Sequence, residues 1–148
     1  MELGRRAEYA LRAAVHLARR NADGVPRKGR VIAEATGVPP QYLPQVLAGL
    51  VRAGLVRSAP GPRGGYALTR APETISLLDV IEAVDGPLTS VVCPLRGVRC
   101  GGAEPCGLHA DWRAAQELAR AGLGAATLAQ VAAREGDAAA LPQRSTPP

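Results

Sequence analysis

Apolar residues recur with the period of an α-helix in the first third of the chain. In residues 5–20 they mark one face at spacings of four, three and four, and turn-forming residues follow at 21–24. Between Arg30 and Gly54 two shorter helical patterns are separated by Gly-Val-Pro-Pro at 37–40, a spacing typical of a helix-turn-helix. The apolar positions of the three patterns are Ala7, Leu11, Ala14 and Ala18; Ile32, Ala35 and Val38; and Leu43, Val46, Leu47 and Leu50.

Two short runs after this motif predict β-strands. Residues 55–58 and 66–69 flank a turn-forming segment, 59–65, that contains two prolines and three glycines. Gly54 stands where a glycine commonly caps the C-terminus of a helix. Two strands joined by a tight basic loop form a β-wing, so the pattern predicts a winged helix.

Helical patterns return beyond the wing. Ser76 to Asp79 fit a capping box that opens a helix, and Gly86-Pro87 ends it. From residue 108 to 122, apolar or small residues alternate at spacings of four and three. Because a small domain offers little surface against which to bury such a helix, we expect a dimer seam, with packing inside the chain as the alternative. The predicted interface residues are Leu108, Trp112, Ala115 and Ala119.

The predicted fold class is mainly α with a small β-wing, a winged helix-turn-helix followed by a long dimerisation helix. We expect a DNA-binding domain at 1–87 and a cysteine loop at 88–107. The dimerisation helix and a terminal helix that begins near Thr127 follow at 108–134. Residues 135–148 lack periodicity and contain three prolines, which favours a disordered tail.

Composition and charge narrow the function. The chain has 148 residues, 47% apolar but only 3% aromatic, which suits one mainly aliphatic core. No window approaches the length of a membrane span, so we expect a cytoplasmic protein. A net charge of +5, carried by arginines and the single Lys28, favours a polyanionic partner over an acidic substrate.

The helix-turn-helix and the wing both carry side chains suited to double-stranded DNA. Gln41, Tyr42 and Gln45 lie at the front of the second helix, off its apolar stripe, where amides can read base edges. The wing can reach phosphates. A solvated helix face is the alternative. The predicted contacts to a DNA operator are Arg27, Lys28, Arg30, Gln41, Tyr42, Gln45, Ser58, Arg63 and Gly64.

The three cysteines of the chain, Cys93, Cys100 and Cys106, fall within fourteen residues of a loop rich in Gly and Pro. Thiolates are the soft ligands that iron–sulfur clusters and zinc require. Gaps of six and five residues are wider than those of usual zinc pairs, and an odd number of cysteines disfavours a closed disulfide framework. The pattern therefore favours an iron–sulfur cluster over zinc, a structural disulfide or unligated thiols. His109, three residues past Cys106, could supply a fourth bond.

An enzyme that uses Cys106 and His109 as nucleophile and base is disfavoured. The sequence contains no recognisable orienting carboxylate or phosphate loop for this pair, and a shared helix turn explains the spacing as well. We therefore predict neither enzymatic activity nor a small-molecule substrate.

Several motifs between about residue 1 and residue 134 point to one family. They are Glu8-Tyr9-Ala10-Leu11, Tyr42-Leu43, Gly54-Leu55-Val56, Gly61-Pro62-Arg63-Gly64-Gly65-Tyr66, the three cysteines, Trp112 and Thr127-Leu128. Together they resemble the bacterial winged-helix regulators that include the iron–sulfur cluster biogenesis regulator and the nitric-oxide-sensing repressor.

This resemblance implies a homodimeric repressor that binds a short, roughly two-fold symmetric operator. It also implies one iron–sulfur cluster per subunit, 2Fe-2S or 4Fe-4S, whose state controls DNA affinity in response to nitric oxide, redox or iron status. Family members take the fourth ligand from a histidine, matched by His109, or from an acidic residue of the partner, matched by Glu8. We favour Glu8 of the partner subunit, because a carboxylate is a displaceable iron ligand. A thiol-switch or zinc-stabilised regulator is the alternative function.

The chain departs from the family pattern at three places. The first cysteine gap is six residues where five is common, and Pro60 stands where relatives often have an arginine. Pro44 occupies a recognition-helix position that is often polar or acidic, although proline is tolerated in a first helical turn. The resemblance therefore carries neither the cluster type nor the operator sequence over to this chain.

Overall fold

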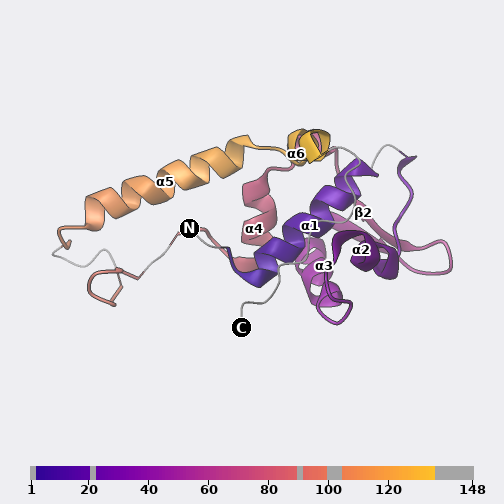
Figure 1. Cartoon of the computed structure of the whole chain (residues 1–148), viewed down its shortest axis with the longest axis horizontal. Coiled ribbons are helices and arrows are strands. Elements are labelled where there is room, and N and C mark those ends of the chain that lie inside the picture. The colour runs from indigo at the N-terminus through magenta and orange to yellow at the C-terminus, as the bar shows by residue number, and fades with distance from the viewer. Residues whose placement is uncertain (1–2, 21–22, 90–91, 100–104, 136–148) are drawn as a thin grey trace.

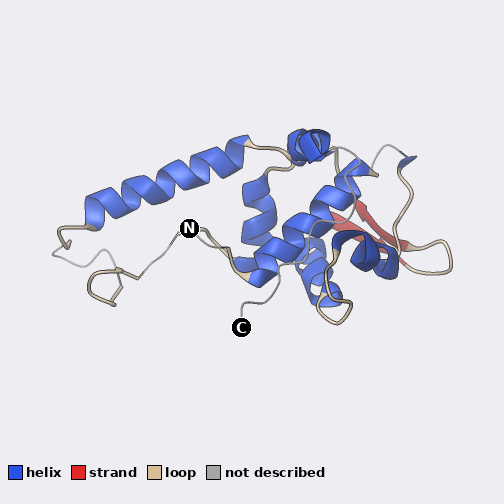
Figure 2. Cartoon of the chain, in the orientation of Figure 1, coloured by secondary structure: helices blue, strands red, loops and turns tan. Residues whose placement is uncertain are grey.

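The computed structural model describes residues 3–20, 23–89, 92–99 and 105–135. Helices dominate these residues, and the strands are confined to one antiparallel pair (Figure 2). The predicted fold class, a mainly α winged helix with a small wing, is thereby confirmed. The elements are α1 (Arg5–Arg19), α2 (Gly29–Thr36), α3 (Leu43–Arg52), β1 (Val56–Ala59), β2 (Gly65–Leu68), the 3-10 helix η2 (Pro72–Thr74), α4 (Leu77–Asp85), α5 (His109–Ala125) and α6 (Leu128–Glu135).

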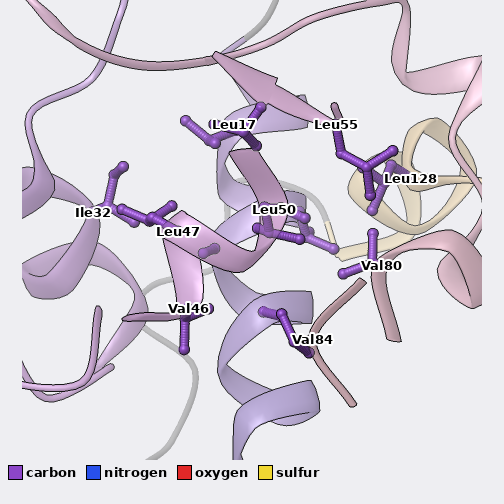
Figure 3. Packing of buried hydrophobic residues seen from close by; sticks show 14 of the residues in the cluster. Leu17, Ile32, Val46, Leu47, Leu50, Leu55, Val80, Val84 and Leu128 are labelled. Carbon is purple, nitrogen blue, oxygen red and sulfur yellow. The ribbon is translucent and has the colours of Figure 1, made fainter. Parts of the chain in front are cut away.

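The core forms around α1, against which α2, α3, α4 and α6 pack. Ala7, Ala10 and Ala13 on α1 are completely buried, and their small side chains let neighbouring helices approach closely. Aliphatic side chains from the other helices fill the space around them (Figure 3). The core is aliphatic, as the composition predicts. The labelled residues of Figure 3 are Leu17, Ile32, Val46, Leu47, Leu50, Leu55, Val80, Val84 and Leu128.

The predicted capping box at the start of α4 is present. The Ser76 hydroxyl accepts a hydrogen bond from the Asp79 amide at 3.0 Å, and the Asp79 carboxylate accepts one from the Ser76 amide at 2.9 Å. Such reciprocal caps satisfy amides that a helix start leaves without partners. α6 begins in the same way, with Thr127 and Gln130 exchanging hydrogen bonds of 3.1 and 3.3 Å.

The wing is a two-stranded antiparallel ribbon in which Val56 pairs with Leu68 and Ala59 with Gly65. Gly65 has a φ of +144°, and a side chain there would meet the Arg27 carbonyl oxygen at 2.4 Å. That close approach allows the amides of Arg27 and Tyr66 each to donate to the carbonyl of the other at 2.8 Å. The wing is therefore pinned to the segment that leads into α2.

Helix α5 differs from the other described α-helices. None of its residues is buried within the chain, and it projects away from the body formed by α1–α4, α6 and the wing (Figure 1). Its C-terminal half rests on α4, where Arg120 forms an ion pair with Glu82. None of the described helices is long and apolar enough to cross a membrane.

Candidate nucleic-acid interface and cysteine site

The recognition helix α3 separates its apolar and polar residues cleanly. Its inward stripe, Leu43, Val46, Leu47 and Leu50, is at most 2% exposed. Gln41, Tyr42, Pro44 and Gln45 are exposed at its N-terminal end, the end that contacts base edges in helix-turn-helix proteins. The predicted reading residues Gln41 and Gln45 are thus available to a duplex.

Tyr42 also has a partner within the chain. Its ring centroid lies 6.1 Å from that of Tyr9 on α1, with the rings tilted by 30°. Aromatic pairs at this separation attract each other weakly, and half of the Tyr42 side chain surface stays exposed. The contact fixes the ring at the start of α3 while its hydroxyl can still reach a phosphate.

Basic side chains gather at the wing and the start of α2. Arg63 is exposed in the wing loop, and Ser58 is exposed on β1. Lys28 donates from Nζ to the Gly61 carbonyl at 3.3 Å, which ties the start of α2 to that loop. The Arg30 side chain is 86% exposed, and its Nε lies 3.7 Å from Oε1 of Glu34. These groups form a surface suited to phosphates.

Two predicted DNA residues have structural roles in the chain. The Arg27 guanidinium is ion-paired with Asp23 and is only 26% exposed. The pKa of Asp23 is lowered by its hydrogen bond from the Val25 amide and by the charge of Arg27. Gly64 is buried, and a side chain there would meet the Ala59 carbonyl oxygen at 2.0 Å, so it shapes the wing turn.

Sequence reasoning did not select Arg57, a further exposed cation on the wing. It lies on β1 and donates from Nη2 to the Gly24 carbonyl at 3.4 Å. Successive residues of a strand point to opposite faces, so the apolar Val56 on the buried face places Arg57 on the exposed face. This alternation could have identified Arg57 from the sequence.

The cysteine segment brings two thiols together. Cys93 and Cys106 are 3% and 9% exposed, and their Sγ atoms lie 3.2 Å apart. Around Cys93 the backbone turns back on itself, because the Cys93 amide donates to Val98 O and the Gly97 amide donates to Cys93 O, both at 2.8 Å. Cys100, the third predicted ligand, lies outside the described residues.

Neither predicted fourth ligand joins this pair within one chain. His109 opens α5, where its amide donates to the Cys106 carbonyl at 2.9 Å, whereas Glu8 is on the first turn of α1. In the described ranges, no cluster of three or more His, Cys, Asp or Glu side chains is arranged to hold a metal ion.

The predicted seam on α5 lines a groove. Trp112, Ala115 and Ala119 face Leu88 and Thr89 across a cavity of about 570 Å³ that is open to solvent. The Trp112 indole nitrogen and the Gln116 carbonyl oxygen are shielded there without a hydrogen-bond partner among the described residues. Leu108 is partly buried at the start of the helix, and Leu118 is 76% exposed.

One polar junction at this groove was not predicted. The Glu82 carboxylate accepts a hydrogen bond from the Leu88 amide at 2.8 Å and pairs with Arg120. Glu82 therefore joins α4, α5 and the residues just before the cysteine segment. Only the fold reveals this pair, because its two members are 38 residues apart in the sequence.

Comparison with known proteins gives a consistent result. A family model named Rrf2 and described as an iron-dependent transcriptional regulator matches residues 3–134. A Mycobacterium tuberculosis protein whose name describes an HTH-type transcriptional regulator is 41% identical over 136 residues, covering 89% of this chain and 81% of its own. The HTH-type regulator IscR of Escherichia coli is 35% identical over 113 residues, covering 76% and 68%. The relatives are regulators and not enzymes, as predicted.

The fold has a close counterpart among solved structures. The global cysteine regulator CymR of B. subtilis superposes with a TM-score of 0.77 at 25% identity, over 90% of this chain and 98% of its own. The chain is therefore similar both to the HTH-type transcriptional regulator IscR and to a regulator named for cysteine.

Proposed function

This chain belongs to the Rrf2 family of transcriptional regulators, and we propose that an iron–sulfur cluster held by its three cysteines controls its affinity for operator DNA. The observation that carries this proposal is the 3.2 Å approach of Cys93 Sγ to Cys106 Sγ. Two thiols from distant points of one loop meet in a shielded position, and the third cysteine lies in the segment that connects them.

The donor set fits such a cluster. Thiolates are the soft ligands that iron–sulfur clusters take, and Cys93 and Cys106 offer two shielded sulfurs only 3.2 Å apart. Cys93, Cys100 and Cys106 would hold the cluster, with Glu8 of the partner subunit or His109 as the fourth ligand. When bound, the cluster supplies a centre sensitive to nitric oxide, oxidants and iron supply.

We further propose that two copies pair through the α5 groove. An apolar groove that contains Trp112 on a helix without buried residues is the kind of surface that an interface covers. Pairing would also bring two recognition helices to one duplex, where successive half-sites lie about 34–36 Å apart. The predicted seam residues Leu108, Trp112, Ala115 and Ala119 would form the contact.

The position of the cysteine segment suggests how the two sites communicate. It lies at the free end of α5, whereas the wing lies on the opposite side of the body (Figure 1). Within one chain this separation is long, but paired α5 helices could carry each segment to the partner's body. That arrangement favours Glu8 of the partner subunit as a ligand. The Arg120–Glu82 pair would then transmit a shift of α5 to α4.

The decisive experiment is anaerobic purification followed by a visible spectrum and operator titration. We expect absorption from an iron–sulfur cluster, and a 5- to 150-fold difference in operator affinity between cluster-containing and cluster-free protein, from a coupling of about 1–3 kcal/mol. A colourless protein without iron would refute the cluster, and equal affinities would refute its control of binding.

A thiol switch is the second candidate, and the same sulfur pair favours it. Hydrogen peroxide would oxidise Cys93 and Cys106 to a disulfide: a bond forms between the two sulfurs, the O–O bond breaks, and the two thiol protons pass to the peroxide oxygens, which leave as two water molecules. Cys100→Ser separates the two candidates. The substitution removes a cluster ligand, but it leaves the Cys93–Cys106 pair able to form a disulfide. Regulated binding that survives in Cys100→Ser would support the switch.

A further inference from the structure

The exposed end of the recognition helix is partly apolar. Pro44, the second residue of α3, is exposed directly beside Gln45. It also borders a cleft of about 230 Å³ between α2, α3 and the wing strand β2. Six apolar or aromatic residues line most of this cleft: Ala33, Pro40, Leu43, Pro44, Leu47 and Tyr66.

In helix-turn-helix proteins the N-terminal residues of the recognition helix contact base edges, so a duplex bound to α3 in this way would bring base edges to this surface. Proline has neither donor nor acceptor on its side chain, so a polar base edge pressed against Pro44 would lose its hydrogen bonds to water without replacement. In the major groove the thymine C5-methyl is the base-edge group that apolar contacts recognise. The chemistry of Pro44 therefore favours contact with thymine.

The neighbouring residue points to the same kind of base pair. A glutamine at the groove-facing end of a recognition helix pairs in bidentate fashion with adenine N6 and N7. Gln45 is exposed and follows Pro44 in the first turn, so the two side chains can reach neighbouring base pairs. Arg30, also at the cleft and 86% exposed, can hold a phosphate beside them.

We propose that Pro44 is a specificity-determining residue, which packs at the rim of the cleft on the C5-methyl of one thymine per half-site, next to the base pair read by Gln45. The inference rests on the proposed binding of this surface to operator DNA. It names the base that the recognition helix selects, which the family resemblance leaves open.

The test begins with selection of a preferred duplex from a random pool by the wild-type protein. Each thymine of one half-site is then replaced in turn by deoxyuridine, which removes only the methyl group. We expect one position at which affinity falls about fourfold, the equivalent of about 0.8 kcal/mol for one methyl-sized group. In Pro44→Ala, which shortens the apolar surface, the thymine-to-uracil ratio at that position should fall towards one.

A matched control is Pro62→Ala, because Pro62 is an exposed proline of the wing and outside the cleft. This variant should keep the wild-type thymine-to-uracil ratio. Thermal unfolding and affinity for random duplex check that Pro44→Ala is folded.

Each result bears on the inference. A selected half-site in which no thymine is sensitive to loss of its methyl would overturn the role of Pro44 while leaving operator binding intact. A sensitive thymine whose ratio is unchanged in Pro44→Ala would assign the methyl contact to another residue. Selection that enriches no sequence would overturn the proposed operator binding and this inference with it.

Discussion

The body of this protein, formed by α1–α4, α6 and the wing, differs from the projecting helix α5, here called the arm, in how far its apolar side chains are buried within the chain. In the body, Ile32, Leu50 and Leu128 are fully buried by neighbouring elements of the same chain. On α5 no residue is buried, and Leu118 is 76% exposed. The apolar side chains of the body are therefore covered by its own elements, whereas those of the arm stay exposed within one chain.

The contrast also separates the two kinds of chemistry. The body presents the proposed DNA-reading residues on a rigid support, since α3 is anchored by four buried aliphatic side chains. The paired cysteines lie next to the start of the exposed arm, and the C-terminal half of the arm rests on α4. The proposed sensor is thus attached to an element with few contacts, which can change its position at little cost to the fold.

The largest effect is expected in the core. Leu50→Ala should lower the free energy of unfolding by about 2–5 kcal/mol, because it removes a completely buried side chain and leaves a cavity. Leu118→Ala on the arm should change it by less than about 0.5 kcal/mol. Urea denaturation followed by circular dichroism measures both. A large loss of unfolding free energy in Leu118→Ala would mean that Leu118 is buried against another molecule in solution.

The next largest effect is expected in the groove. Trp112→Glu puts a charge into the proposed apolar interface, so the protein should sediment as a monomer that is still folded. Loss of bivalent binding should weaken operator affinity by about 100-fold or more. Ala114→Glu, an exposed position off the seam, is the matched control and should stay dimeric. A dimeric Trp112→Glu protein would place the interface elsewhere.

The fourth cluster ligand provides a smaller and more specific test. After anaerobic reconstitution, Glu8→Ala should alter the cluster spectrum and reduce the cluster-dependent change in operator affinity, a change expected to be about 5- to 150-fold in wild type. His109→Ala should leave both close to wild type. The reverse pattern would confine ligation to one chain and remove the proposed route through the partner subunit.

The body could be predicted well from sequence because its elements follow local rules. Apolar residues that recur with the 3.6-residue period of an α-helix predict the helices. The capping box of Ser76 and Asp79 predicts the first residue of α4 correctly. The predicted start of the tail at residue 135 differs from the structure by one position, since Glu135 ends α6; residues 136–148 lie outside the described ranges. Boundary errors of this size are expected where helix signals fade.

The site could be predicted only in part, because contacts between distant residues have no local signal. The ion pair of Arg27 with Asp23 and the burial of Gly64 follow from the way the wing meets the start of α2. The junction of Glu82 with Arg120 depends on where α5 crosses α4. The clustering of the cysteines in one loop suggests that they lie close together, but the 3.2 Å separation of Cys93 Sγ and Cys106 Sγ depends on the fold of that loop.

On the body's DNA face, two substitutions should have different signatures. Arg63→Ala removes an exposed wing cation, so the log–log salt slope of operator binding should become less negative by about 2 for a dimer, roughly one per subunit. Gln45→Ala should keep the slope and relax preference at one base pair per half-site, by about 1–3 kcal/mol. Wild-type behaviour of both variants would exclude this face.

The smallest effect concerns His16, which lines a groove of the body between α1, α2 and α6. Burial lowers the pKa of His16, and the positive charges of Arg20, Arg27 and Arg19 lower it further. As pH falls below the ordinary pKa of 6.5, the histidine of the unfolded chain takes up a proton before His16 of the folded protein does. Protonation therefore favours the unfolded chain, so His16 lowers the free energy of unfolding at acidic pH and has no such effect well above pH 6.5. Between pH 7.5 and pH 5.5 we expect the melting temperature to fall by about 1–3 °C more in wild type than in His16→Gln.

This difference should persist in the monomeric Trp112→Glu protein, because His16 and its three arginines all belong to the body. Differential scanning calorimetry at the two pH values, for wild type, His16→Gln and each combined with Trp112→Glu, measures it. Loss of the His16 effect in the monomer would mean that the arm of a partner contributes to this groove. The stability of the body would then depend in part on the arm of a partner subunit, contrary to the contrast drawn here between body and arm.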